Sequence, residues 1–272
     1  MIIEEALRST AKELSNVAER PRLEAEILLS YYLNKDRVWL HMNSNKEIGE
    51  LQEFFKLAKR RKEYEPIEYI TGRVSFYDIE LEVGPGVLIA RPETELLVDK
   101  AAEIIHKHNL KVMCEIGIGS GAISIMLARF FSELKIIATD ISEVALNYAK
   151  KNIKRYGFED RIELHKTNLL DGIDKSIEII VSNPPYICEE FDLPKPVLYE
   201  PKSALFGGEI GDELLRKIIL IAKDRRVPHL VCEMGYDQRE PILNFCKVKN
   251  LNEPLFYKDL AELDRGFYLT TK

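Results

Sequence analysis

An asparagine, two prolines and a tyrosine stand at residues 183–186, directly after the β-branched run IEIIVS. Adjacent prolines cannot continue a strand ladder or an ordinary helical turn. Because Asn183 precedes a proline, its backbone is driven toward an extended conformation. We therefore expect a strand that ends in a stiff turn and carries the Asn183 amide and the Tyr186 phenol at its tip. Such stiffness suits a site that must hold something still.

A glycine-rich loop forms a second candidate site, between a predicted strand and a predicted helix. Its residues are Gly117, Ile118, Gly119, Ser120 and Gly121. Glycines there let the backbone turn tightly and approach a ligand without a Cβ clash. Asp140 ends the next predicted strand, about 20 residues further on, where a carboxylate can grip a ribose diol. Together these features indicate nucleoside binding; the alternative is that Asp140 caps the helix that begins near Ser142.

The spacing of the loop is GxGxG, and no Lys-Ser or Lys-Thr pair follows, which excludes a triphosphate-binding loop as far as the motif goes. The loop resembles the first motif of S-adenosylmethionine-dependent methyltransferases. That resemblance implies that residues 117–121 wrap the amino-acid and sugar parts of the cofactor, that Asp140 binds the ribose hydroxyls, and that Asn168 lies by the adenine. Glu115 stands where such families often have Asp.

The motif at residues 183–186 is similar to that of methyltransferases that modify planar nitrogens in adenine, guanine or glutamine. An amide nitrogen is a poor nucleophile because its lone pair is delocalised. The side-chain oxygen of Asn183 and the backbone oxygen of Pro184 could hold its two hydrogens and aim the lone pair at the methyl group of a cofactor bound beside Asn183. Pro184 and Pro185 would fix that backbone, and Tyr186 would offer an aromatic face to the substrate. The alternative is a structural turn in which Asn183 caps and Tyr186 packs.

The composition of the chain argues against some classes of function. The 272 residues are 46% hydrophobic, as in an ordinary globular core, and carry a net charge of −6 with a pI near 5.6. This balance argues against a dedicated nucleic-acid binder. The basic run at residues 59–62 ends a predicted helix, where cations are favoured, so a solvated helix end is preferred over a phosphate-binding patch.

The four cysteines are far apart and histidine is sparse, so we expect no metal site. Scattered thiols of this kind suggest reduced residues in the cytoplasm. The acidic, amphipathic start of the chain does not resemble a signal peptide, and the apolar runs fall short of the ~18 residues of a membrane span.

Hydrophobic periodicity predicts three segments. Residues 1–72 are expected to form a helical domain, with Pro21 near the start of its second helix and a third helix over residues 47–63. Residues 73–90 are expected to form a linking β-hairpin, broken at Gly84-Pro85-Gly86. Residues 91–272 alternate between strands and helices. Their seven predicted strands indicate an α/β domain with a mostly parallel, Rossmann-like sheet, which binds ligands at the carboxyl ends of its strands.

Three longer segments of the sequence resemble one particular family of methyltransferases. Residues 66–98, the segment LYEPKSALFGGEIGDELLRKII at 198–219 and CEMGYDQ at 232–238 resemble, in order, the signatures of peptide chain release factor N5-glutamine methyltransferases. The resemblance covers nearly the whole chain. It implies a seven-stranded class I S-adenosylmethionine-dependent domain that methylates the glutamine of the Gly-Gly-Gln loop in release factors and yields S-adenosyl-L-homocysteine. The helical domain would help to dock the protein substrate.

The departures from this family are mild. Ala90 replaces a usual Pro, Ile118 a common Thr and Glu115 the common Asp. Arg91, Glu93 and Glu95 match the family; they either frame the cofactor cleft or supply charge to the first turn of a helix.

Three alternatives stay open. One is a glutamine methyltransferase that acts on a ribosomal protein, and another is an adenine-N6 nucleic-acid methyltransferase, which the acidic net charge disfavours. A third is a silent binding module, which the intact Asn183, Asp140 and glycines disfavour.

Overall fold

The computed structural model describes residues 1–271, which divide into two compact units. The helical unit contains Met1–Arg73 together with Leu193–Tyr199, and the sheet unit contains residues 74–192 and 200–271. No sequence signal assigns residues 193–199 to the helical unit. The domain boundaries expected at residues 72 and 90 stay predictions.

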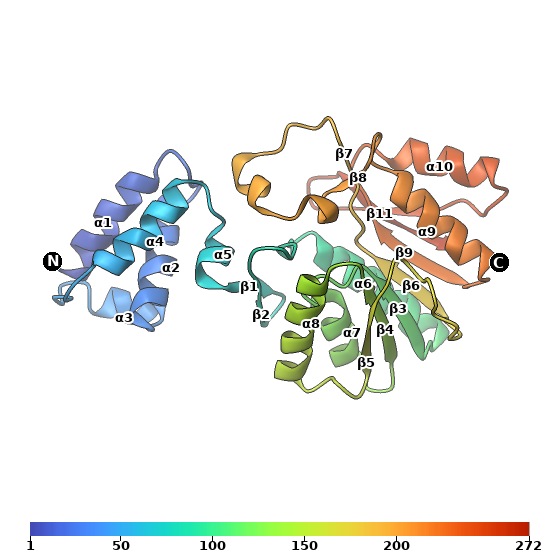
Figure 1. The fold of residues 1–272 in the computed structure, drawn as a ribbon, viewed down its shortest axis with the longest axis horizontal. Coiled ribbons are helices and arrows are strands. Elements are labelled where there is room, and N and C mark those ends of the chain that lie inside the picture. The colour runs from blue at the N-terminus through green and yellow to red at the C-terminus, as the bar shows by residue number, and fades with distance from the viewer. Residues whose placement is uncertain (272) are drawn as a thin grey trace. The chain divides into compact units, whose positions relative to one another are not determined.

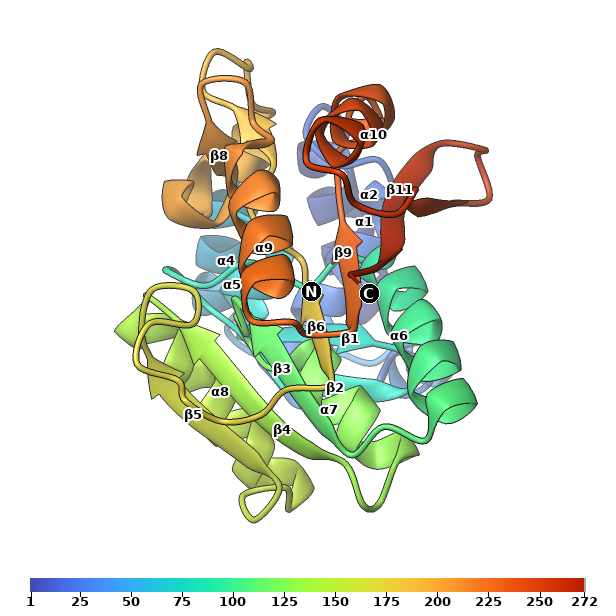
Figure 2. The same cartoon turned by 90° about the vertical axis from the view of Figure 1, so that its right-hand side faces the viewer.

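A seven-stranded sheet forms the centre of the sheet unit, as the alternating pattern predicts (Figure 1). Its order is β10-β11-β9-β6-β3-β4-β5, and Figure 2 shows β5, β4, β3, β6 and β9 side by side. The strands are β3 (Val112–Ile116), β4 (Lys135–Asp140), β5 (Ile162–Lys166), β6 (Ile179–Ser182), β9 (His229–Glu233), β10 (Leu255–Lys258) and β11 (Asp264–Thr270). Only β11 runs antiparallel to its neighbours, β9 and β10, in the described part of this sheet. The predicted mostly parallel α/β class is confirmed.

The strand order reverses beside β3. From β3 the chain proceeds outward through β4 and β5, then returns to place β6 on the other side of β3. The two central strands are parallel, and Ile116 pairs with Ser182 at their carboxyl ends. The glycine loop and the proline turn therefore leave the sheet next to each other, at the switch point where such sheets bind ligands.

Helices cover both faces of this sheet (Figure 1). On one face lie α6 (Thr94–His108), α7 (Ala122–Phe130) and α8 (Glu143–Tyr156); on the other lie α9 (Glu213–Asp224) and α10 (Arg239–Val248). Alternate strand residues such as Cys114, Ile180 and Leu230 pack against Ile218 of α9 and Ile242 of α10. Strands buried on both faces explain the nearly continuous apolar runs in the sequence.

The predicted hairpin is present, but its turn was misplaced. Strands β1 (Arg73–Phe76) and β2 (Ile79–Glu82) pair with each other and are joined by Tyr77 and Asp78. Tyr77 adopts a φ of 51°, and its N–H donates to Glu95 Oε1 at 2.7 Å. This side-chain acceptor stabilises a tyrosine where glycine is usual. The Gly84-Pro85-Gly86 stretch lies after β2 and is no hairpin turn.

The segment after the proline turn holds elements that the sequence analysis missed. Strands β7 (Ile187–Cys188) and β8 (Phe206–Gly208) form a small parallel pair. Between them lie two 3₁₀ helices, Lys195–Tyr199 and Lys202–Ala204. Within residues 1–271 we find no helix with the length and apolar character that crossing a membrane requires. The expected location in the cytoplasm stays a prediction.

The helical unit contains α1 (Ile3–Leu14), α2 (Pro21–Leu33), α3 (Arg37–Met42), α4 (Gln52–Lys62) and α5 (Ile67–Thr71). Pro21 is the first residue of α2, as predicted. The third predicted helix was too long at its start, because α4 begins at Gln52, and the short α3 was not foreseen. Side chains such as Leu7, Leu28 and Phe54 are fully buried where these helices meet.

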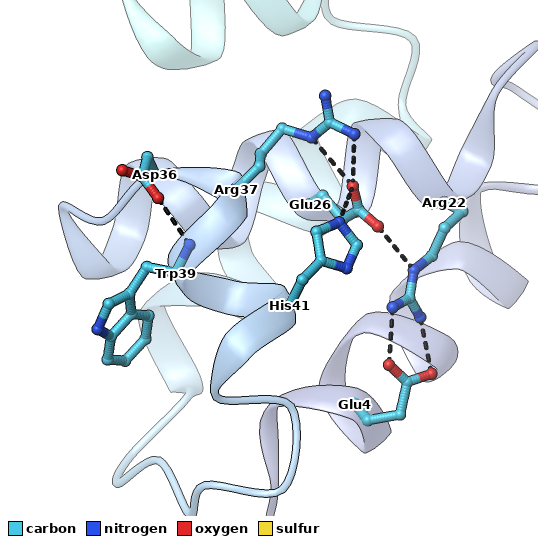
Figure 3. A network of polar contacts seen from close by, with 7 residues as sticks. All are labelled: Glu4, Arg22, Glu26, Asp36, Arg37, Trp39 and His41. Atoms are coloured by element: carbon cyan, nitrogen blue, oxygen red, sulfur yellow. Dashed lines mark hydrogen bonds and ion pairs between the residues drawn. The ribbon is translucent and has the colours of Figure 1, made fainter.

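A buried carboxylate ties three of these helices together (Figure 3). Glu26 of α2 is 3% exposed and accepts hydrogen bonds from Arg22 at 3.0 Å and from Arg37 of α3 at 2.8 Å. Arg22 in turn forms a bidentate pair with Glu4 of α1. Burial opposes the charge of Glu26, but the bonds from Arg37 and Arg22 outweigh it and hold its pKa below the ordinary value.

We expect Glu26→Gln to destabilise the chain at pH 7, because glutamine loses the charge-assisted bonds. The partner arginines are half exposed, so the loss should be about 1–3 kcal/mol rather than the larger cost of a fully buried pair. A lowered folded pKa means that this stability is present above about pH 4.5 and fades as the pH falls through the folded pKa. Thermal unfolding at pH 7 and pH 3.5 should therefore show a difference from the parent chain that shrinks in acid. Glu53→Gln, which removes only an exposed pair with Lys56, is the control; an equal effect of both changes would contradict this account.

Candidate active site

An open pocket lies in the sheet unit at the carboxyl ends of β3, β4, β5 and β6. Seven of the residues singled out from the sequence line it: Gly117, Gly119, Asp140, Asn168, Asn183, Pro184 and Pro185. The two motifs therefore share one cavity. Residues far apart in the chain meet there because their strands are neighbours in the sheet.

The glycine loop uses backbone conformations that favour glycine. Gly117, Gly119 and Gly121 have φ values of 78°, 57° and 92°. A Cβ at Gly117 or Gly119 would meet no described atom within 4 Å, so these positions demand glycine for conformation and not for local space. Gly121 is the N-cap residue of α7, which starts directly behind the loop.

The carboxylate of Asp140 braces this loop. Its Oδ2 accepts from Gly119 N at 3.0 Å, and its Oδ1 accepts from Ser142 N at 2.8 Å. Burial raises the pKa of Asp140, while these backbone N–H groups oppose the rise. The N-cap of α8 is Ser142, whose hydroxyl accepts from Ala145 N at 3.2 Å. Each oxygen of Asp140 keeps a lone pair for a further donor, so the carboxylate has the capacity to accept from two neighbouring hydroxyls.

The amide of Asn183 is tethered at its nitrogen. Asn183 Nδ2 donates to the hydroxyl of Thr94, the first residue of α6, at 3.0 Å. Within residues 1–271, no donor reaches Asn183 Oδ1 or the carbonyl oxygen of Pro184. Two acceptors on a rigid turn are thus free where the turn lines the pocket.

Tyr186 is not among the described residues that line the pocket. Its ring packs against the core between the sheet, α9 and α10, and its hydroxyl donates to Glu233 Oε1 at 3.0 Å. Gln238 Nε2 donates to the Tyr186 carbonyl at 2.8 Å and so holds the end of the turn from the other side. The predicted role of Tyr186 as an aromatic face for the substrate stays a prediction.

Other loop residues act behind the pocket wall. Ile118 and Ser120 are buried, and neither they nor Gly121 are among the described residues that line the cavity. Asn152 Nδ2 donates to the Ser120 carbonyl at 2.9 Å, which anchors the loop on α8. Their predicted contacts with a cofactor stay predictions.

Glu115, within β3, is fully buried. The Ser124 hydroxyl donates to Glu115 Oε2, while Oε1 has no partner among the described residues. Burial raises the pKa of Glu115 to about 8, against the opposing hydrogen bonds from Ser124.

The charged residues before α6 have partners outside the pocket lining. Arg91 forms an ion pair with the buried Glu200, and Glu95 holds the hairpin turn at Tyr77. Glu93 is the N-cap residue of α6. In the described chain none of these three lines the pocket, and their predicted part in framing it stays untested.

Several residues of the pocket wall carry no functional signal in the sequence. Gly86, Val87 and Leu88 come from the segment after β2, and Pro201, Ser203 and Ala204 come from the segment after the proline turn. A Cβ at Gly86 would approach Val144 of α8 to 2.9 Å, and its φ is 93°. The Gly84-Pro85-Gly86 signal could have marked a loop at the site, but no periodicity shows which loops converge there.

Comparisons with known proteins agree with this architecture. Residues 5–72 match the family model described as the PrmC N-terminal domain, and residues 92–193 match the methyltransferase small domain. The release factor glutamine methyltransferase of Clostridium acetobutylicum is 36% identical over 253 residues, which cover 89% of this chain and 88% of that protein. The protein of the same name from Dictyoglomus turgidum is 42% identical and covers 80% of this chain and 79% of its own length.

Solved structures show the same fold at lower identity. The catalytic domain of human METTL16 in complex with the MAT2A 3'UTR hairpin 6 has a TM-score of 0.58 at 16% identity, over 71% of this chain and 76% of that one. The N-terminal domain of human METTL16 in complex with SAH has a TM-score of 0.53 at 16% identity, over 85% and 87% of the two chains. The identity to these relatives assigns the family: the chain belongs to the release factor glutamine methyltransferases and is an enzyme of this kind.

Proposed function

We propose that this enzyme transfers a methyl group from S-adenosylmethionine to the side-chain amide nitrogen of the glutamine in the Gly-Gly-Gln segment of peptide chain release factors. Membership of the family supports the reaction and the class of protein substrate. The observation that carries the chemistry is the pair of unoccupied acceptors, Asn183 Oδ1 and the Pro184 carbonyl, at the pocket that the glycine loop also lines.

The residues of the pocket fit S-adenosylmethionine. Asp140 retains acceptor capacity for the two hydroxyls of a ribose, and the bare backbone of Gly117 and Gly119 leaves room for close approach. Asn168, after β5, lines the pocket and would lie by the adenine, as predicted; its neighbour Leu169 lines the pocket too. A solved structure with the same fold, from human METTL16, contains SAH, the demethylated form of such a cofactor. The cofactor would supply an electrophilic methyl group.

The chain's own contribution is orientation of the substrate amide. A glutamine NH₂ group has two hydrogens, and the Asn183 Oδ1 and Pro184 carbonyl oxygens would accept one each. Both acceptors sit on a turn that two prolines stiffen, so little reorganisation accompanies the reaction. Holding both hydrogens in place favours a nitrogen whose lone pair points at the methyl group. The surplus proton can leave after transfer, so the mechanism requires no strong general base.

Two other substrate classes receive less support. A ribosomal-protein substrate would use the same acceptor pair, and nothing in the sheet unit favours it over a release factor. The likeness to an RNA-bound structure, at 16% identity, concerns the fold alone. With a net charge of −6, the chain is not expected to act directly on nucleic acid.

Methyl transfer can be tested with labelled S-adenosylmethionine and a release factor fragment that contains Gly-Gly-Gln. We expect label on the glutamine side chain, and none when that glutamine is replaced by alanine. A ribosomal protein and a nucleic acid, offered separately, test the alternatives. Absence of transfer to the fragment, with transfer to either alternative, would overturn the proposal.

Replacement of Asn183 by alanine removes one of the two acceptors. We expect Asn183→Ala to lower kcat by a factor that corresponds to about 2–4 kcal/mol, as for the loss of one oriented polar group in other active sites. Calorimetry should show that its affinity for S-adenosylhomocysteine stays within about twofold of the parent, because the amide acts on the substrate. Asn147→Ala, an exposed change on α8, is the control. A parent-like kcat for Asn183→Ala would remove this residue from the mechanism.

A side chain at Gly119 should disturb the cofactor side of the pocket. Its φ of 57° costs a non-glycine residue about 1–2 kcal/mol, although no atom obstructs the added methyl group. We therefore expect Gly119→Ala to weaken S-adenosylhomocysteine binding about tenfold, with a small decrease in thermal stability. Gly49→Ala is the control, because Gly49 is exposed and has an ordinary φ. Unchanged affinity would show that the loop backbone does not govern binding.

A further inference from the structure

A buried carboxyl group stands behind the proline turn. Glu233, the last residue of β9, is 3% exposed. Strands β6 and β9 are parallel neighbours, with Ser182 opposite Cys232. Asn183 and Glu233 are therefore the next residues on two adjacent strands, and the carboxyl group lies at the level of the turn.

Two hydroxyl groups, those of Tyr186 and Thr94, lie between this carboxyl group and the proline turn. The Tyr186 hydroxyl donates to Glu233 Oε1 at 3.0 Å. The Thr94 hydroxyl accepts from Asn183 Nδ2 at 3.0 Å and lowers the pKa of Glu233, although within the described chain it forms no direct hydrogen bond with that carboxylate. Glu233 Oε2 is buried and has no hydrogen-bond partner within the described chain. Burial of an acid with an unsatisfied oxygen is costly, which argues for a functional reason to keep it.

We propose that Glu233 is a positioning residue: its ionised carboxylate, acting through Thr94, fixes which end of the Asn183 amide faces the substrate. This inference rests on the proposed role of Asn183 in methyl transfer.

The direction of the hydrogen bonds determines the orientation of the Asn183 amide. A side-chain amide can accept at one end and donate at the other, and the two orientations have nearly the same shape. An ionised Glu233 can only accept, so it accepts from the Tyr186 hydroxyl, and its negative charge attracts the hydrogen of the Thr94 hydroxyl. The Thr94 oxygen is then left to accept, which selects the amide orientation with Nδ2 toward Thr94. Asn183 Oδ1 consequently remains free for a hydrogen of the substrate.

A neutral Glu233 would remove this selection. A protonated carboxyl can donate to Thr94, whose own hydrogen could then turn to Asn183. The amide could rotate and present its NH₂ group to the substrate NH₂ group, where two donors meet without an acceptor. The catalytically useful state is therefore the one with ionised Glu233.

The surroundings of Glu233 place this change near neutral pH. Burial raises its pKa to about 7, against the opposing effects of Thr94 and Tyr186. Among the charged groups, Glu93 raises the pKa and Arg265 lowers it. The polar and titratable groups that face the carboxyl are Thr94 and Glu93 from the start of α6, Tyr186 from the turn, Tyr257 from β10 and Arg265 from β11. We expect kcat to rise with pH as Glu233 loses its proton.

The experiment compares kcat and KM of the full chain and its variants between about pH 6 and 9, with labelled S-adenosylmethionine and the Gly-Gly-Gln fragment. For Glu233→Gln we expect kcat about 10- to 100-fold lower at pH 8 and loss of the rise near pH 7. Its affinity for S-adenosylhomocysteine should stay within about twofold of the parent. Glu240→Gln, an exposed change on α10 with the same loss of charge, is the control.

Stability separates positioning from damage to the fold. A raised folded pKa means that Glu233 lowers stability as the pH rises through that pKa. Glu233→Gln should therefore unfold at a temperature no lower than the parent at pH 8, while its kcat is low. If it fails to fold, a second pair decides: Thr94→Val should lower kcat, and Thr94→Ser, which keeps the hydroxyl, should restore most of it.

The outcomes distinguish two failures. If the parent chain does not methylate the fragment, the proposed function falls. If the parent methylates it but Glu233→Gln keeps the parent kcat and pH profile, only the positioning role falls. Equal losses in Thr94→Val and Thr94→Ser would also overturn that role.

Discussion

The parallel pairing of β3 with β6 is the constraint on which the site depends. Ile116 and Ser182 are paired at the last residues of these strands, so the glycine loop and the proline turn begin at the same level and one strand apart. A shift of one residue would reverse which side chains face α9 and α10, and the buried Cys114 and Ile180 resist it. The hydrophobic pattern of two central strands thereby determines the distance between the glycine loop and the proline turn.

Polar groups that would be costly elsewhere gather around this junction. Glu115 is the last but one residue of β3, Asp140 and Glu233 are the last residues of β4 and β9, and burial raises the pKa of each carboxyl group. Such desolvated acids lower the stability of the ionised folded state, so their clustering is more typical of a functional site than of a core. The fold offsets this cost through the apolar packing of both sheet faces. Within the sheet unit, the apolar packing on both faces of the sheet provides stability, while the polar groups of the candidate site lie at the strand ends.

Much of this organisation is predictable from the sequence, and the rest is not, for physical reasons. Continuous apolar runs give the seven strands, and the order of the motifs gives the loops at their ends. The hairpin turn at Tyr77 was missed because a side-chain acceptor from Glu95, 18 residues away, replaces the usual glycine. Thr94 and Glu233 went unnoticed because their contacts span α6 and β9 and leave no local pattern. Residue types reveal the groups that do chemistry more readily than the groups that orient them.

The arrangement of acceptors also explains why an amide, and not its acid, suits the site. In the proposed reaction, the glutamine side chain would bring two hydrogens to Asn183 Oδ1 and the Pro184 carbonyl, whereas a glutamate carboxylate would bring only lone pairs. Two acceptors that face a carboxylate have no hydrogen to accept, and a site built to bind an NH group can reject an analogue without it by about 10⁴-fold. In the proposed arrangement, ionised Glu233 would favour the same substrate from behind the turn, because it would keep the Asn183 oxygen directed toward the substrate. In this proposal the substrate nitrogen donates to Asn183, Asn183 donates to Thr94, and the hydrogen of Thr94 is attracted by the buried carboxylate of Glu233. The same order of donors and acceptors would both select the amide and orient its nitrogen.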